Sequence, residues 1–321
     1  MLPATPLHGS AAWIGDNGSG PAAALYRGAL REYRRLEAEL PGAPIRWTGS
    51  LSWTDDPSTP GAPGSGPHQG FTLGSAEVAA LEPNLRRPPA QVTHAPGDGA
   101  VDPLALTETL LRAARQQGTE ILLAAATGLR HDAGRFAGVE TSAGFLPADT
   151  VVLAAGVDMP VLCSPLGVDL PVEASPALLV RFTAPHDLVR TVVSSPEIEV
   201  RQNLDGGLLA AVPYDGRSTP EELADTGRRA LTLITSMFRR AEAIALNSVS
   251  VGIRPVPVDG VPIVGRLPGA PDVFVAVMHS GVQLAAIAGR LVAEEIVERV
   301  DATELSGCRP TRFFRQAADL S

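Results

Sequence analysis

Few residue types in this chain are suited to chemistry. All 26 basic residues are arginine, which excludes a lysine Schiff base, a Walker lysine and a lysine general base. The two cysteines, Cys163 and Cys308, lie far apart with no CxxC pair and no neighbouring pair of histidines. This spacing supports neither a zinc site nor a disulfide framework, so we predict no metal centre and a reducing, cytoplasmic location.

One glycine motif has the spacing of a phosphate-binding loop. Residues Gly18 to Ala23 fit the pattern GxGxxA. Such a loop must follow a strand and open a helix, and an acidic residue must end a second strand about 20 positions later. The residues before Gly18 do not form an adequate strand pattern, and no such acidic residue follows. We therefore do not assign dinucleotide binding to this motif.

Helix and strand patterns alternate through the first half of the chain. Leucines spaced among Ala, Arg and Glu predict a helix over 21–40, and a carboxylate followed by proline, Asp102-Pro103, predicts the start of another that ends near Gly118. The leucines of that second helix, with Ala114, are expected on one face. Alternating or continuous apolar runs predict strands over 47–53, 121–125, 136–141 and 149–156. The last of these is apolar throughout, which predicts burial on both faces.

The second half begins with short β-rich segments between 171 and 212, broken by Pro and Gly, and this change suggests a second domain. Thr219 and Glu222 have the spacing of a capping box and predict a helix that ends near 241. A strand over 273–277, a tight turn at 279–281 and a long helix then restore the strand-then-helix pattern. Together these elements predict an open α/β sheet with a second, β-rich domain.

Composition limits the classes of function. With 321 residues and 45% hydrophobic residues, the chain can build a buried core and has the length of about two domains. A formal net charge of −9 argues against nucleic acid as a partner. The first residues lack the basic and apolar regions of a signal peptide, and no run approaches the length of a membrane span.

Three stretches of the chain form a recognisable series of motifs. The first runs from Asp102-Pro103 to the apolar strand that ends at Gly156. The second is Gly252-Ile253-Arg254-Pro255 with the following Asp259-Gly260, and the third is Val277-Met278-His279-Ser280-Gly281-Val282. Their joint order covers most of the chain and is far more specific than any one motif. In this order the chain resembles the FAD-dependent oxidoreductases related to D-amino-acid oxidase and glycine oxidase.

The resemblance implies a fold and a domain division. Residues 1–40, 90–170 and 250–321 would form a discontinuous, Rossmann-like FAD-binding domain, and residues 41–89 and 171–249 a β-rich, α+β substrate-binding domain, with 55–70 as a flexible loop. Members of the family begin with a strand, a GxGxxG turn and a helix, and this chain starts after that first βαβ unit. We expect its absence to leave the 150–155 strand with an unpaired edge and to separate 121–125 from its neighbours. A start assigned too late, a partner chain that supplies the unit, and a degraded paralogue remain open explanations.

The resemblance also implies a non-covalent FAD and the residues around it. The turn at His279, Ser280 and Gly281, with the amides of Val282 and Gln283, would face the flavin, and the alternative is an ordinary strand-to-helix turn. Ala126 and Gly156 would add further cofactor contacts. Arg254 would bind the substrate carboxylate, unless it serves a surface or interdomain ion pair. No catalytic residue is assigned, because binding and orientation carry most of flavin amine oxidation.

Two functions from different classes therefore remain. The first is an FAD-dependent oxidoreductase that oxidises a C–N bond of a small amine or amino acid by hydride transfer to flavin. The second is a flavin-free paralogue or subunit that acts as a ligand-binding or structural partner. Neither requires a membrane or nucleic acid.

Overall fold

The computed structural model describes residues 12–16, 18–54, 70–132 and 134–314. The chain divides into two compact units, each made of segments that are discontinuous in sequence. Unit 1 comprises residues 1–19, 26–110 and 176–253, and unit 2 comprises residues 20–25, 111–175 and 254–321. Residues 55–69 of the predicted flexible loop lie outside the described residues.

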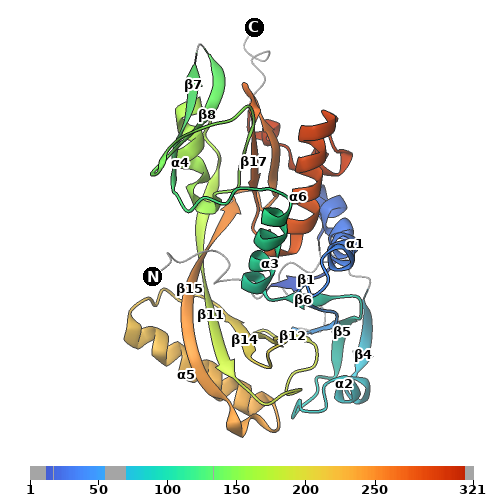
Figure 1. Ribbon diagram of the computed structural model, residues 1–321. Helices are drawn as coiled ribbons and strands as arrows, with labels where there is room; N and C mark the ends of the chain where they lie inside the picture. Colours follow the sequence, from blue (N-terminus) through green and yellow to red (C-terminus); the bar gives the residue numbers. More distant parts are fainter. Residues whose placement is uncertain (1–11, 17, 55–69, 133, 315–321) are drawn as a thin grey trace. The chain divides into compact units, whose positions relative to one another are not determined.

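An eight-stranded sheet forms the centre of unit 1, with the strand order β15-β11-β14-β13-β12-β3-β5-β4 (Figure 1). The pairings from β11 to β4 are antiparallel except for β12 and β3, which run parallel. The start of β11, up to Ser175, and the end of β15, from Arg254, belong to unit 2. The strands are β3 (Ser50–Ser52), β4 (Phe71–Gly74), β5 (Gln91–Ala95), β11 (Val172–Thr183), β12 (Val192–Ser194), β13 (Glu199–Gln202), β14 (Leu208–Val212) and β15 (Ala245–Pro257).

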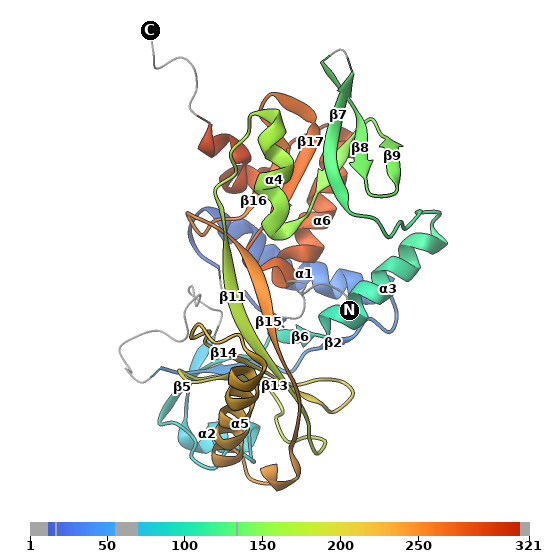
Figure 2. The same cartoon turned by 90° about the vertical axis from the view of Figure 1, so that its left-hand side faces the viewer.

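Helix α5 (Pro220–Met237) packs on one face of this sheet, as Figure 2 shows. Its predicted capping box is confirmed, because the Thr219 hydroxyl accepts from the Glu222 amide at 3.3 Å and the Glu222 carboxylate accepts from the Thr219 amide at 3.0 Å. Ala230 and Ile234 of α5 join the core formed by alternate residues of the sheet. The short helix α2 (Ser75–Leu81) adds Val78 to the same core.

A second, smaller sheet of unit 1 has the order β1 (Trp13–Ile14), β6 (Gly99–Val101) and β2 (Ile45–Arg46), and all its pairs are antiparallel. The helix predicted over 21–40 is α1 (Ala23–Glu39), preceded by a 3-10 turn at Gly20–Ala22. The helix predicted after Asp102 is α3 (Pro103–Gln116). Its cap is the Asp102 carboxylate, which accepts from the amides of Leu104 and Ala105, both at 3.0 Å.

Unit 2 contains a three-stranded sheet with the order β10 (Val151–Leu153), β17 (Ala270–Val277) and β16 (Ile263–Leu267). β10 runs parallel to β17, and β16 runs antiparallel to it. The odd-numbered residues of β17 from Val273 to Val277 share a core with helix α4 (Met159–Cys163). The long helix predicted after this strand is α6 (Gly281–Glu298), which contacts β16 and β17.

Two sequence predictions in unit 2 are wrong. Residues 121–125 form no strand, and Leu123 is 97% exposed, because none of the described strands pairs with 121–124 to complete the hydrogen bonds. The Ala125 carbonyl accepts from the Ser142 amide at 2.9 Å.

The 149–156 segment does form β10, but Val152 is 43% exposed. Val152 points to the face that no described element covers, whereas Leu153 points to the buried face. β10 also lies at the edge of its sheet among the described strands, which agrees with the unpaired edge expected there.

A separate antiparallel sheet of unit 2 consists of β7 (Ala126–Asp132), β8 (Arg135–Thr141) and β9 (Gly144–Pro147). β8 confirms the strand predicted over 136–141.

The apolar face predicted for helix α3 is only partly covered. Leu106 is buried, whereas Leu110 and Leu111 are each 38% exposed.

Short 3-10 turns close the described part of unit 2, at Thr303–Cys308 and Pro310–Phe313. Glu295 of α6 is buried, and its carboxylate accepts from the Arg309 guanidinium at 2.8 Å and from the Ala302 amide at 2.7 Å. Arg312 pairs with Asp259 at 2.7 Å and so holds the turn before β16. None of the described helices combines the length and apolar character needed to cross a membrane.

The compact units differ from the predicted domains at several boundaries. Residues 1–19, 26–40 and 90–110, which the resemblance groups with the FAD-binding part, lie in unit 1. The boundaries predicted at 171 and 250 lie at 176 and 254. The assignment of FAD-binding and substrate-binding roles to the two parts of the chain remains a proposal.

Candidate functional site

The parallel pair β10 and β17 determines where the predicted cofactor residues meet. Leu153 is opposite Val275, so the two strands end at the same edge of the sheet. The chain after β10 continues to Gly156, and the chain after β17 continues to His279, Ser280 and Gly281. In open α/β sheets, ligands bind outside the carboxyl ends of parallel strands. The structure therefore brings two separate predicted segments to one edge of unit 2.

Backbone geometry at both turns suits the close approach of a ligand. Gly156 has a φ of 60°, a left-handed conformation that favours glycine. A Cβ added to Gly281 would meet no heavy atom within 4 Å, so the backbone at the start of α6 borders open space. Helix α6 has 18 residues, and its aligned peptide dipoles place partial positive charge at Gly281 and the amides that follow. These features suit an electron-rich or anionic group.

Arg254 lies in the last part of β15, within unit 2, and is partly buried. Its Nη2 donates to the Ser175 hydroxyl of β11 at 3.1 Å. Its Nε is enclosed and has no hydrogen-bond partner, and Arg254 forms no ion pair with any described residue. The ion pair considered as the alternative role for this arginine is thus absent from the described part of the chain. Burial lowers the pKa of Arg254, but a guanidinium remains charged in proteins.

His279 lies within the electrostatic reach of Arg254. The pKa of His279 is below its usual range, first because part of the ring is shielded from water and second because the positive charge of Arg254 opposes protonation. His279 as a whole is nonetheless exposed. The imidazole is therefore neutral at pH 7, and the cationic charge at this point belongs to Arg254 alone.

The remaining predicted cofactor residues lie in two different places. Val282 and the buried Gln283 form the first turn of α6, beside Gly281. Ala126 is exposed and begins β7, where it pairs with Thr141 of β8 and not with β10 or β17. The structure thus groups Gly156, Arg254 and the 279–283 segment in unit 2, and it places Ala126 in a separate sheet of that unit.

The GxGxxA segment does not have the geometry of a phosphate loop. The described strand before it, β1, is antiparallel to β6 and has two residues. A Cβ at Gly18 would fall within 1.7 Å of the Tyr26 ring, so this glycine is required by packing.

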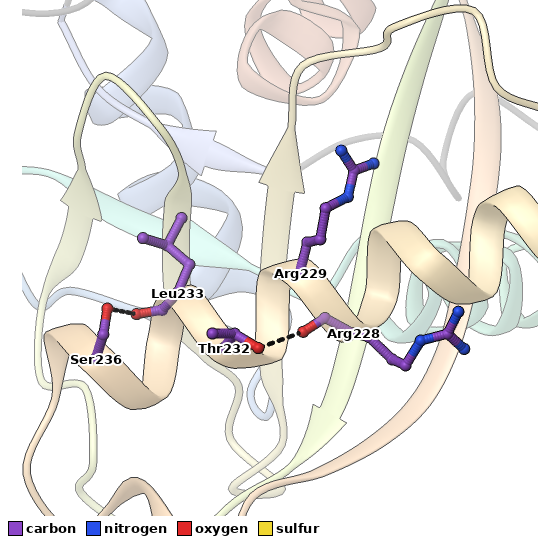
Figure 3. Close-up of a pocket in the computed structure, with 5 residues that line it drawn as sticks. All are labelled: Arg228, Arg229, Thr232, Leu233 and Ser236. Carbon is purple, nitrogen blue, oxygen red and sulfur yellow. Dashed lines mark hydrogen bonds between the residues drawn. The ribbon is translucent and has the colours of Figure 1, made fainter.

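A shallow surface pocket of about 390 Å³ lies on α5 and is lined by Arg228, Arg229, Thr232, Leu233 and Ser236 (Figure 3). The hydroxyls of Thr232 and Ser236 donate to carbonyls of their own helix, at 3.0 and 2.7 Å. Both arginines pair with Asp225. Since its polar groups already have partners, this pocket does not compete with the edge of unit 2 as a candidate site.

Sequence reasoning missed Ser175. It lies 79 positions from Arg254, in a strand with no motif, and nothing in the sequence identifies it as the partner of that arginine. Only the placement of β11 and β15 brings the two side chains together.

Comparison with known proteins gives consistent matches. The family model described as "FAD dependent oxidoreductase" matches residues 5–295. A D-amino acid dehydrogenase of Paramagnetospirillum magneticum is 30% identical over 255 residues, covering 74% of this chain and 58% of that protein. A glycine oxidase of Pseudomonas putida is 28% identical over 148 residues, covering 44% of this chain and 40% of that protein. The chain thus spans about half the length of these relatives. The crystal structure of glycine oxidase from Geobacillus kaustophilus matches with a TM-score of 0.81 at 22% identity, covering 98% of this chain and 90% of that one.

Proposed function

Because this chain belongs to the family of FAD dependent oxidoreductases, we propose that it acts with FAD in the oxidation of an amino acid or a small amine. The family assignment confirms the resemblance found in the sequence, and the fold match agrees with the predicted α/β class with a β-rich part. The observation that carries the proposal is Arg254, a partly buried guanidinium with an enclosed, unpartnered Nε and no ion pair among the described residues.

Arg254 would bind the substrate carboxylate. The planar guanidinium offers donors in a fork that matches the two oxygens of a carboxylate. Ser175 uses one donor of Nη2 and leaves the Nε side for a ligand. Because no described carboxylate competes for it, a bound substrate would supply the missing counter-charge. This geometry favours amino acids over amines that lack a carboxylate.

The described residues fit the flavin end of FAD. Gly156 and Gly281 allow the backbone to approach a flat ring, and the start of α6 favours the negative charge that a reduced flavin carries. The amides of Val282 and Gln283, with His279 and Ser280, would line the same side, and Ala126 would add a backbone contact. When bound, FAD would supply the electron acceptor for a hydride from the carbon next to the substrate nitrogen. With the cysteines buried elsewhere, we propose that it binds non-covalently.

His279 would act as a neutral hydrogen-bonding group. Its lowered pKa keeps a second positive charge away from Arg254, so the substrate carboxylate meets a single cation. The neutral ring also does not repel the substrate amine, which must be uncharged to release a hydride. The residues of the site thus bind and orient the substrate, which is the main protein contribution in cofactor chemistry of this type.

The free edge of β10 supports the proposal that a further βαβ unit pairs there. β10 is parallel to β17 on one side and pairs with no described strand on the other, and its residue Val152 is 43% exposed. The described residues contain no strand, GxGxxG turn and helix in sequence that would hold the phosphates of FAD. Such a unit could come from the same polypeptide or from a partner chain.

A direct test is to add FAD to the purified full chain, remove free flavin and record the visible spectrum. We expect bound flavin that is bleached anaerobically by amino acids. Arg254→Gln should raise the KM for amino acids about 10- to 100-fold, because it removes a charge-assisted bidentate pair. Arg112→Gln, which removes an exposed arginine of unit 2 with no described partner, is the matched control and should change nothing. A colourless protein that takes up no FAD would favour the flavin-free alternative.

A further inference from the structure

The face of the eight-stranded sheet opposite α5 carries charged side chains. Val180, Phe182, Leu208 and Ala210 point toward α5 and belong to its core, so the residues between them point the other way. Arg181 of β11 is opposite Leu209 of β14, which in turn is opposite Arg201 of β13. The three side chains share one face, and the two arginines lie about 10 Å apart across two strand spacings.

Two of the three arginines near this face are held by the protein itself. Arg201 is buried and donates to the Val101 carbonyl at 2.7 Å and to Asn203 Oδ1 at 2.6 Å. Arg46 donates to the carbonyls of Gln202 and Asn203, at 2.9 and 3.2 Å. Both side chains thus have structural roles, since they fix the strand β13 and the turn after it.

Arg181 has no such role. It is partly buried, and its side chain makes no hydrogen bond and no ion pair with any described residue. Burial lowers the pKa of Arg181, and the more distant charge of Asp102 partly offsets this effect. Asp102 itself is engaged as the cap of α3. No described residue therefore competes with a ligand for the Arg181 guanidinium, which is charged and offers paired donors to a carboxylate.

The same face also has an acceptor without a donor. Glu199 lies two residues before Arg201 on β13, and therefore on the same side of the sheet. Its Oε1 is enclosed and has no hydrogen-bond partner. Burial raises the pKa of Glu199 to about 7, against the attraction of Arg201. At pH 7 the Glu199 carboxyl group therefore carries part of a negative charge. This charge repels a ligand with two negative charges more strongly than it repels a carboxylate with one.

We propose that Arg181 is the anchor of an anion-binding site in unit 1 that takes the carboxylate of a small molecule. This site differs from the one assigned to Arg254, which belongs to unit 2. Binding at Arg181 does not depend on the proposed function.

The test uses the full chain with Arg254→Gln, so that the carboxylate site proposed in unit 2 is removed. Butyrate is titrated while the amide signals of Arg201 and Leu209 are followed by NMR. We expect saturable shifts, and Arg181→Gln added to this background should weaken binding about tenfold or more. Adding Arg87→Gln, which removes an exposed arginine of unit 1 with no described partner, should leave binding unchanged. Absence of butyrate binding, or equal binding with and without Arg181, would overturn the proposal.

Two further measurements keep the proposal testable if Arg181→Gln does not fold. Glu199→Gln removes the repelling carboxyl and should tighten butyrate binding about two- to fivefold at pH 8, and unchanged or weaker binding would contradict the site. Inorganic phosphate should bind more weakly than butyrate, and equal or tighter binding would contradict the assignment to a carboxylate.

Discussion

Substitution of Ser175 by alanine is the sharpest test of how the structure holds Arg254. The Ser175 hydroxyl accepts from Arg254 Nη2 at 3.1 Å. Among the described residues, Ser175 is the side chain that accepts a hydrogen bond from this guanidinium. In the alanine variant the guanidinium keeps its charge but loses the contact that fixes its plane. The Arg254 guanidinium would then have to become ordered when the substrate carboxylate binds, and this ordering would cost binding free energy.

The expected effect follows from the charge of the donor. A hydrogen bond to a charged group contributes about 1.5–3 kcal/mol, and the partial exposure of both residues places this one at or just below the lower limit of that range. About 1–1.5 kcal/mol corresponds to a loss of about 5- to 12-fold in kcat/KM. Because orientation of the carboxylate acts on bound substrate and transition state alike, the loss should lie in KM, with kcat nearly unchanged.

The assay is the anaerobic reduction of the bound flavin over a range of amino-acid concentrations. Ser175→Thr retains the hydroxyl and should keep most of the activity. An amine of the same size without a carboxylate should be oxidised equally by the Ser175→Ala variant and the unchanged chain. The reasoning would be refuted if the variant lost activity equally toward both substrates, or if kcat fell while KM stayed the same.

Three predictions concern stability. Glu295→Gln should lower the free energy of unfolding by about 3–5 kcal/mol, because it leaves the Arg309 guanidinium without its buried carboxylate, and replacing both by apolar residues should recover much of the loss in a denaturant titration. Burial raises the pKa of Glu199 to about 7, so the carboxyl group binds its proton more tightly in the folded chain than in the unfolded chain, and the stability from this proton declines as pH rises from about 4.5 to 7. The Glu199→Gln variant should lack this decline. If its melting temperature followed the same pH profile as that of the unchanged chain, this prediction would be wrong. Leu123→Ser should change stability by less than about 0.5 kcal/mol, since that side chain is 97% exposed, and a loss above about 2 kcal/mol would indicate that 121–125 packs as a strand after all.

Local sequence determined the elements whose signals lie within a few residues. The cap of α5 depends on Thr219 and Glu222, three positions apart, and the cap of α3 on Asp102 and the next two amides. The apolar run that forms β14 is likewise continuous. Motif order was sufficient to identify the family, because it too is a property of the sequence.

Tertiary structure decided everything that depends on a distant partner. The same kind of apolar run became β10 where β17 supplied a neighbour, and it became no strand at 121–125 where none did. Ser175 meets Arg254 only because β11 and β15 place them together, and Gly156 shares an edge with Gly281 only because β10 and β17 run parallel. A helix closes its hydrogen bonds within one turn, whereas a strand and a binding site are completed by residues far along the chain, and their pairing is fixed only when the whole chain folds.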